Sequence, residues 1–172
     1  GEAKKRGNFF LLVGRLIPYK RVDLAVMAFN RLGLPLVVVG KGSEEMKLKA
    51  MAKGNIKFKG ELTERELADY YRKCAALVLP QEEDFGIAAV EAQAAGASVI
   101  AFKAGGALDT VSDCKTGVFF EKQSVPALRK AVKNFEKISF DAKILRENAE
   151  RFSKERFKKE FLTLVAKIDG KL

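Results

Sequence analysis

The sequence predicts an α/β protein with a doubly wound, Rossmann-like parallel sheet of about six strands and helices on both faces. Two observations predict this fold class. Short apolar runs, such as FFLLV (9–13) and PLVVV (35–39), lack the polar alternation of half-exposed strands and are typical of strands buried on both faces. Single helical segments separate these runs, and strands that alternate with helices form parallel sheets. Ligands bind such sheets in the crevice beyond the carboxyl ends of the strands.

The first half of the chain is predicted to alternate strand and helix three times. Strands are expected at 9–13, 35–39 and 55–60. Apolar residues at helical spacing predict the first helix, which Gly33 ends: Val22, Ala25, Val26 and Phe29. Residues 43–52 are expected to form the second helix. Thr63 and Glu66 have the spacing of a capping box, which predicts a third helix through Lys73.

The second half continues the pattern with strands expected at 75–80, 97–102 and 117–120. The alanine-rich segment after the first of these is predicted to be a helix. Two or three helices are expected to finish the chain, with Ser153 as an N-cap before the last. That last helix carries an apolar stripe at i, i+4, i+7, i+8 and i+11, formed by Phe157, Phe161, Leu164, Val165 and Ile168.

Composition excludes several classes of function. The chain of 172 residues has no histidine, which removes Ser-His-Asp and Cys-His nucleophiles and most zinc sites. Cys74 and Cys114 lack metal-ligand spacing, so reduced thiols are expected. No apolar run approaches the ~18 residues of a membrane span, and the first residues do not resemble a signal peptide. A cytoplasmic protein is expected, with the cytoplasmic face of the membrane left open.

The net charge of +10 leaves four interpretations open. The chain could bind nucleic acid, contact an anionic membrane peripherally, hold phosphate in a pocket, or simply carry a solvated lysine- and glutamate-rich surface. Its basic residues are dispersed, and no zinc-finger or RNA-recognition signature is present. We therefore expect no nucleic-acid partner.

Three segments that follow predicted strands carry candidate ligand groups. GRLIPYKR (14–21) places Gly14 beside Arg15 and Lys20 at the mouth of a helix, a pattern suited to a diphosphate. VGKGSEE (39–45) resembles half a phosphate loop, and a simple turn before a helix is the better interpretation of it.

The third segment, EEDFGIAAVEAQAAG (82–96), is the most specific. Phe85, Gly86 and Ile87 open a helix whose free N–H groups attract an anion, and Gly86 leaves room for it. Glu83 and Glu91 flank that helix start. Carboxylates accept hydrogen bonds from sugar hydroxyls, so these two acids are expected to hold a ribose and a sugar on either side of the phosphates.

With these motifs in view, the chain resembles the retaining family 4 glycosyltransferases. EDFGIAAVE matches the E-x7-E element of that family. VGRLIPYKRVDLAV, NIKFKGEL, EAQAAGASVIAFKAGGALDTV and TGVFF resemble further family segments in the family's order, up to NAERFSKERFKKEF. The likeness is greatest to the mannosyltransferases of O-antigen and related surface-polysaccharide assembly. It implies the C-terminal, donor-binding half of a GT-B fold.

The resemblance implies a role for each candidate residue. Arg15 and Lys20 bind the donor diphosphate, which Gly14 admits. Glu91 holds the ribose hydroxyls, and Glu83 faces the donor sugar near the reacting carbon. The amides of Phe85, Gly86 and Ile87 receive sugar and phosphate, Gly60 and Leu62 frame the base, and Gly40 lines the nucleotide side. Glu83, Arg15 and Lys20 are the expected catalytic residues, with no metal and no cofactor. GDP-mannose is the favoured donor, and a glycan or lipid-linked molecule the acceptor.

The chain departs from the family pattern in places. Arg21 stands where many members have glycine, Ser98 replaces a usual proline, Gln93 a usual methionine, Asp109 a usual glutamate and Lys154 a frequent tryptophan.

The acceptor-binding domain of a GT-B enzyme is absent from these residues. We expect a linker remnant at 1–8, the donor-binding domain at 9–138 and C-terminal helices at 139–172, the last packing toward the missing domain. The isolated domain is expected to be inactive. The rival functions are a basic nucleic-acid-binding module and a GT-B relative, an epimerase or phosphorylase, that acts on sugar nucleotides without transfer.

Overall fold

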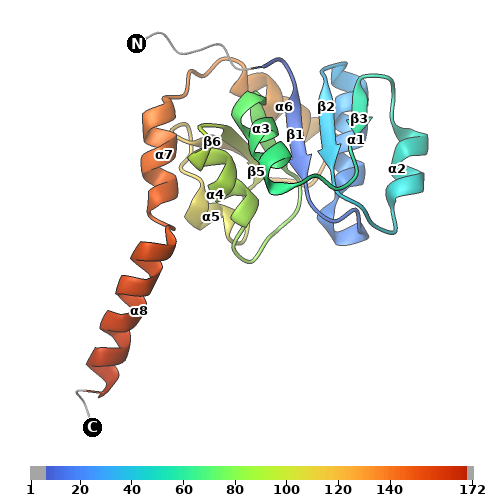
Figure 1. Ribbon diagram of the computed structural model, residues 1–172. Coiled ribbons are helices and arrows are strands. Elements are labelled where there is room, and N and C mark those ends of the chain that lie inside the picture. Colours follow the sequence, from blue (N-terminus) through green and yellow to red (C-terminus); the bar gives the residue numbers. More distant parts are fainter. Residues whose placement is uncertain (1–6, 170–172) are drawn as a thin grey trace.

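The computed structural model describes residues 7–169, without the side chains of residue 164 and residues 166–169. Its core is one parallel sheet of six strands in the order β3-β2-β1-β4-β5-β6 (Figure 1). The strands are β1 Phe10–Val13, β2 Leu36–Val39, β3 Ile56–Phe58, β4 Ala76–Leu79, β5 Ser98–Phe102 and β6 Gly117–Phe120. The predicted fold class and the number of strands are confirmed.

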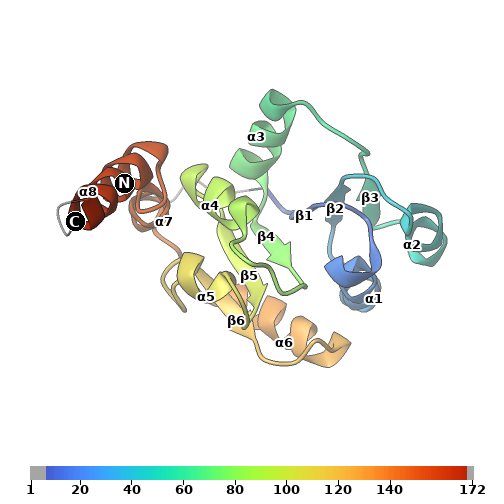
Figure 2. The same cartoon turned by 90° about the horizontal axis from the view of Figure 1, so that it is seen from below.

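Helices cover both faces of this sheet, as the unbroken apolar strands require. They are α1 Val22–Leu32, α2 Glu45–Met51, α3 Glu64–Lys73, α4 Ile87–Ala94, α5 Ala107–Thr110, α6 Val125–Phe135, α7 Ala142–Glu150 and α8 Lys154–Asp169, with a 3₁₀ turn at Pro18–Lys20. Apolar residues of α1, α2 and α6 form the core on one face, and those of α3, α4 and α5 form the core on the other. Figure 2 shows α1 and α6 opposite α3 and α4.

Local sequence signals explain where several helices begin. The capping box is confirmed: the Thr63 hydroxyl accepts from the Glu66 amide at 3.3 Å, and the Glu66 carboxylate accepts from the Thr63 amide at 2.9 Å. Ser153 also caps its helix, since its hydroxyl accepts from the Arg156 amide at 3.3 Å. The second helix begins at Glu45, two residues later than predicted, and α5 was not predicted at all.

A buried polar cluster fixes α7 against α4. The Asn148 amide nitrogen donates to Gln93 Oε1 at 2.6 Å and to the Thr110 carbonyl at 2.9 Å. Gln93 Nε2 donates to the same Thr110 carbonyl at 2.8 Å. Buried amides are costly unless they are hydrogen-bonded, so the two side chains require one another. Gln93, a departure from the expected methionine, therefore has a structural partner on α7.

Helix α8 extends away from the sheet beyond α7 (Figure 1). Its apolar side chains face solvent: Phe157 is 70% exposed, Phe161 54% and Val165 36%. The described part of the predicted stripe is thus exposed. The side chains of Leu164 and Ile168 lie outside the described residues, as does most of the predicted linker at 1–8. Among the described helices, none has the length and apolar character needed to cross a membrane.

Because the described side chains of α8 are largely exposed, removing residues 159–172 is expected to lower the free energy of unfolding by no more than about 1 kcal/mol. Urea unfolding followed by circular dichroism measures this change. Asn148→Ala is the matched control, since it leaves buried partners unsatisfied and is expected to cost about 1–3 kcal/mol. A truncated chain that no longer folds would show that α8 belongs to this core.

Candidate functional site

The predicted ligand residues gather at one edge of the sheet. Gly14 and Arg15 follow β1, Gly40 follows β2, Gly60 and Leu62 follow β3, and the segment from Glu83 to Ile87 follows β4. All strands are parallel, so their carboxyl ends share this edge. The strand order reverses between β1 and β4, and doubly wound sheets bind ligands beyond the carboxyl ends of the strands at such a reversal. The structure therefore brings the predicted residues to one region.

Glycines let the turns after β1 and β2 touch backbone to backbone. A β-carbon on Gly40 would lie 1.9 Å from the Gly14 carbonyl oxygen, and one on Gly42 would lie 2.3 Å from the Leu16 carbonyl oxygen. The Gly40 amide also donates to the Gly60 carbonyl at 2.7 Å, which joins the turn after β3. Gly40 and Gly60 thus build the floor of this region from main chain alone. Leu62 packs beside it, partly buried against the core.

Lys20 and Glu83 form an ion pair across the reversal point. The Lys20 ammonium donates to Glu83 Oε1, which also accepts from Gln81 Nε2 at 2.6 Å. The Lys20 side chain is 14% exposed and that of Glu83 23%. Burial lowers the pKa of Lys20, but the hydrogen bonds and charges of Glu83 and Tyr19 outweigh it and raise the pKa above its usual value. Lys20 is therefore a cation held in place, whereas Arg15 nearby is exposed.

Helix α4 begins beside this pair without a side-chain cap. Its N-cap is Gly86, at φ 80°, a backbone conformation that favours glycine. Free N–H groups at such a helix start carry partial positive charge and attract anions. Phe85 and Ile87 on either side are exposed. The ion pair and the helix start together supply positive groups from two separate loops.

The loop after β5 packs against the segment that precedes α4, a contact that was not predicted. The Gly106 amide donates to the Glu83 carbonyl at 2.6 Å. A β-carbon on Gly105 would lie 2.3 Å from that carbonyl oxygen, and one on Gly106 would lie 2.5 Å from Phe85 Cα. The two glycines thus let this loop pass directly against the segment that carries Glu83.

Tyr71 of α3 orients Glu91, and the sequence analysis missed this residue as well. The Tyr71 hydroxyl donates to Glu91 Oε2 at 3.1 Å, and the ring is buried in the core beneath α4. Burial is the main cause that raises the pKa of Tyr71, and the Glu91 charge and hydrogen bond add to it. Tyr71 therefore stays protonated and donates to one of the two carboxylate oxygens of Glu91.

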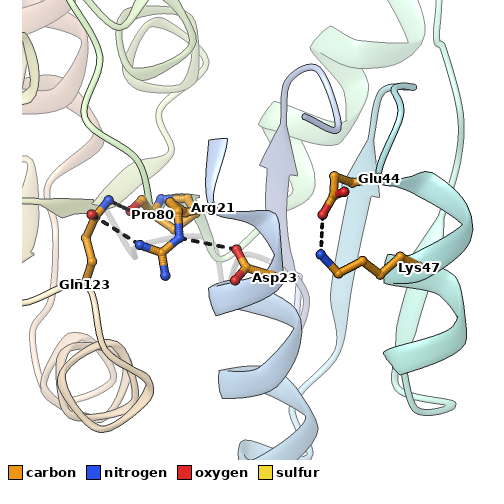
Figure 3. Close-up of polar contacts among 6 residues, drawn as sticks. All are labelled: Arg21, Asp23, Glu44, Lys47, Pro80 and Gln123. Carbon is orange, nitrogen blue, oxygen red and sulfur yellow. Dashed lines mark hydrogen bonds and ion pairs between the residues drawn. The ribbon is translucent and has the colours of Figure 1, made fainter. Parts of the chain in front are cut away.

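Arg21 has a backbone conformation that is unusual for a residue other than glycine. It has φ 50° and ψ 34°, the left-handed region. Its guanidinium lies between Asp23 and Gln123, with nitrogen–oxygen distances of 3.4 Å to each (Figure 3). Gln123 Nε2 donates to the Pro80 carbonyl at 2.9 Å. Figure 3 also shows the Glu44–Lys47 ion pair, with a nitrogen–oxygen distance of 2.6 Å, to the right of Asp23.

Metal ligands are not clustered in the part of the chain that the structure describes. No group of three or more Cys, Asp or Glu residues there is arranged to hold a metal ion.

Comparison with known proteins identifies relatives along most of the chain. The family described as "Glycosyl transferases group 1" matches residues 1–155. An uncharacterised glycosyltransferase of Methanocaldococcus jannaschii is 32% identical over 153 residues, which cover 86% of this chain and 44% of that protein. A GDP-mannose-dependent α-mannosyltransferase of Mycolicibacterium smegmatis is 39% identical over 110 residues, 63% of this chain and 29% of that protein.

The fold has solved counterparts. A sucrose-phosphate synthase from Thermosynechococcus elongatus superposes with a TM-score of 0.83 and 25% identity, over 96% of this chain and 46% of that one. The chain thus spans less than half the length of each of these three proteins. The structural likeness supports the GT-B expectation for the fold.

The raised pKa of Tyr71 gives a test of this site. Because the folded pKa lies above the unfolded value near 10, the stability it contributes is fully present below about pH 10 and is lost as the pH rises toward the folded pKa. In alkaline absorbance titrations, the difference between wild type and Tyr71→Phe should show no ionisation while the chain stays folded. A difference curve with an ordinary tyrosine midpoint in the folded chain would contradict the buried hydrogen bond.

Proposed function

Because the chain belongs to the group 1 glycosyl transferases, we propose that it binds a nucleoside diphosphate sugar at the reversal point between β1 and β4 and that the whole protein transfers the sugar to an acceptor. The observation that carries this proposal is the Lys20–Glu83 pair beside the uncapped start of α4. A cation and free helix amides suit a diphosphate, and a carboxylate beside them suits sugar hydroxyls. Few other ligands require all three groups together.

In this proposal each part of the ligand has its own partner. Lys20, Arg15 and the amides of Phe85–Ile87 take the diphosphate, with Gly14 and Gly40 providing backbone space. Glu91, oriented by Tyr71, takes the ribose, and the backbone near Gly60 and Leu62 frames the base. Glu83 takes the sugar. The ammonium of Lys20 is paired with Glu83 in the structure, so in this proposal the diphosphate replaces one anionic partner of Lys20 by another.

The chemistry that these residues support is departure of the nucleoside diphosphate. As the bond between the anomeric carbon and the phosphate oxygen breaks, negative charge grows on the leaving diphosphate. Fixed cations and helix amides stabilise that charge without needing to reorganise. We propose that Lys20 and Arg15 act in this way and that transfer retains the anomeric configuration, in line with the resemblance.

The favoured donor is GDP-mannose, and the support comes from the α-mannosyltransferase of M. smegmatis, whose name states that dependence. We further propose that a second domain binds the glycan or lipid-linked acceptor, that α8 packs toward it, and that the described domain alone does not turn over. The alternatives of a nucleic-acid-binding module and of a non-transferring relative gain no specific observation from the site.

The proposal predicts selective stabilisation by ligand. GDP or GDP-mannose is expected to raise the free energy of unfolding more than AMP, NAD or an oligonucleotide does. At a ligand concentration of one hundred times the dissociation constant, the increase over the chain without added ligand should be ~2.7 kcal/mol. A thermal-shift panel with isothermal titration measures this. A preference for UDP would keep the nucleotide-sugar site and overturn the mannose assignment. No response to any nucleoside diphosphate would overturn the site.

Two variants sharpen this measurement. Lys20→Met removes the cation and is expected to weaken nucleoside diphosphate binding by about tenfold or more, the effect of one charge-assisted hydrogen bond. Glu83→Gln removes the competing carboxylate, so binding of the nucleoside diphosphate should be kept or strengthened. Equal losses in both variants would point to structural damage instead.

The proposed diphosphate site also predicts binding without metal. Since cationic groups and helix amides meet the phosphates, the dissociation constant for the nucleoside diphosphate should be the same with and without EDTA. Titration calorimetry in both buffers checks this. Binding that is lost on chelation and restored by magnesium or manganese would contradict it.

A further inference from the structure

We propose that Arg21 and Gln123 are positioning residues that keep the turn bearing Lys20 in register with the loop bearing Glu83 when a ligand is bound. The inference rests on the proposed function, because it assigns the diphosphate to Lys20 and the sugar to Glu83. It concerns two residues that make no proposed contact with the ligand. Their contacts join three loops that follow different strands.

The first observation is the backbone of Arg21. At φ 50° a β-carbon crowds the neighbouring carbonyl, so glycine would be less strained at this position. The Arg21 amide closes the turn by donating to the Pro18 carbonyl at 3.1 Å. Non-glycine residues persist in this region where surrounding contacts hold them, and such residues cluster at functional sites. The contacts of the Arg21 side chain must therefore explain why a residue other than glycine is kept in this left-handed conformation.

The second observation is where that side chain reaches. Arg21 Nη1 lies 3.4 Å from Gln123 Oε1, and Gln123 comes from the loop after β6 (Figure 3). Gln123 in turn donates to the Pro80 carbonyl at 2.9 Å, at the end of β4. Three residues further on is Glu83. Gln81, between them, donates to Glu83 as well. Arg21, in the turn before α1, is thus linked through Gln123 to Pro80 at the start of the loop after β4, and this loop carries Glu83.

These contacts matter once the direct ion pair opens. In the structure the Lys20–Glu83 ion pair joins the two loops directly. When the ammonium turns to a diphosphate and the carboxylate to a sugar hydroxyl, that bond is lost. The path through Arg21, Gln123 and Pro80 remains, because none of its atoms takes part in the exchange. It then sets the separation between the phosphate-binding and sugar-binding groups.

A purely electrostatic role for Arg21 makes a different prediction. A cation next to Lys20 attracts a diphosphate whether or not it contacts Gln123. Gln123 carries no charge, so Gln123→Leu breaks the path and leaves the field at the site unchanged. Arg21→Lys keeps the charge and the strained backbone but lacks the planar fork of the guanidinium. These two variants separate positioning from attraction.

The experiment is titration calorimetry with GDP and GDP-mannose, or with UDP and UDP-glucose if wild type prefers uridine. The proteins compared are wild type, Arg21→Gly, Arg21→Lys, Gln123→Leu and the Arg21→Gly/Gln123→Leu double variant. The readout is the affinity for the sugar nucleotide divided by that for the nucleoside diphosphate. Each single variant should lower this ratio about fivefold, the factor for one ordinary hydrogen bond, and the double variant no further. Glu121→Gln is the matched control, since Glu121 lies in the same loop as Gln123 and forms an exposed ion pair with Lys103, which follows β5.

Folding is checked by thermal melts, in which Arg21→Gly should be no less stable than wild type because it relieves the left-handed backbone. An unchanged ratio in Gln123→Leu overturns the inference. So does a wild-type ratio in Arg21→Lys, or an equal loss for both ligands in Arg21→Gly alone, because either would assign Arg21 to attraction. A wild-type chain that binds neither nucleotide rejects the proposed function, and the inference falls with it.

Discussion

The position of β1 at the centre of the sheet determines where every candidate ligand group lies. β1 pairs with β2 from Phe10–Leu36 to Val13–Val39 and with β4 at Leu11–Leu77. Because these strands are parallel, the loops that follow them leave from the same edge, and the loops after β1 and β4 lead to helices on opposite faces. Lys20 precedes α1 on one face, and Glu83 precedes α4 on the other. Their ion pair spans the only place where the winding of the sheet reverses among the described strands.

Much of this fold could be predicted because its signals are local. Apolar runs, helical spacing and the Thr63–Glu66 capping box each lie within a few residues of one another, and the structure confirms the elements that they predict. α5 escaped because four residues are too few to show a helical period. The late start of α2 has a different reason. The turn around Gly42 packs on the Leu16 carbonyl, and this contact joins residues that are distant in the sequence.

The candidate site was predictable as a set of loops but not as a set of contacts. Glu83 and Lys20 were each expected to meet a ligand, yet nothing in their local sequence says that they pair with one another. Tyr71 lies 20 residues from Glu91, and Gln123 lies 43 residues from Pro80. Such partners are chosen by the packing of helices on the sheet. The sequence pattern indicates that packing only through the spacing of apolar residues. This spacing does not predict which hydroxyls and amides will meet a partner.

The glycines of the loop after β5 limit how this protein can change over evolutionary time. Even alanine at Gly105 or Gly106 would place its methyl group inside the main chain of the segment from Glu83 to Phe85. Single substitutions there are closed to natural variation unless the backbone moves with them. Ile87, in contrast, begins α4 with its side chain 64% exposed. For the proposed site, we therefore expect new ligand preferences to arise through exposed side chains such as Ile87, while the two glycines stay unchanged.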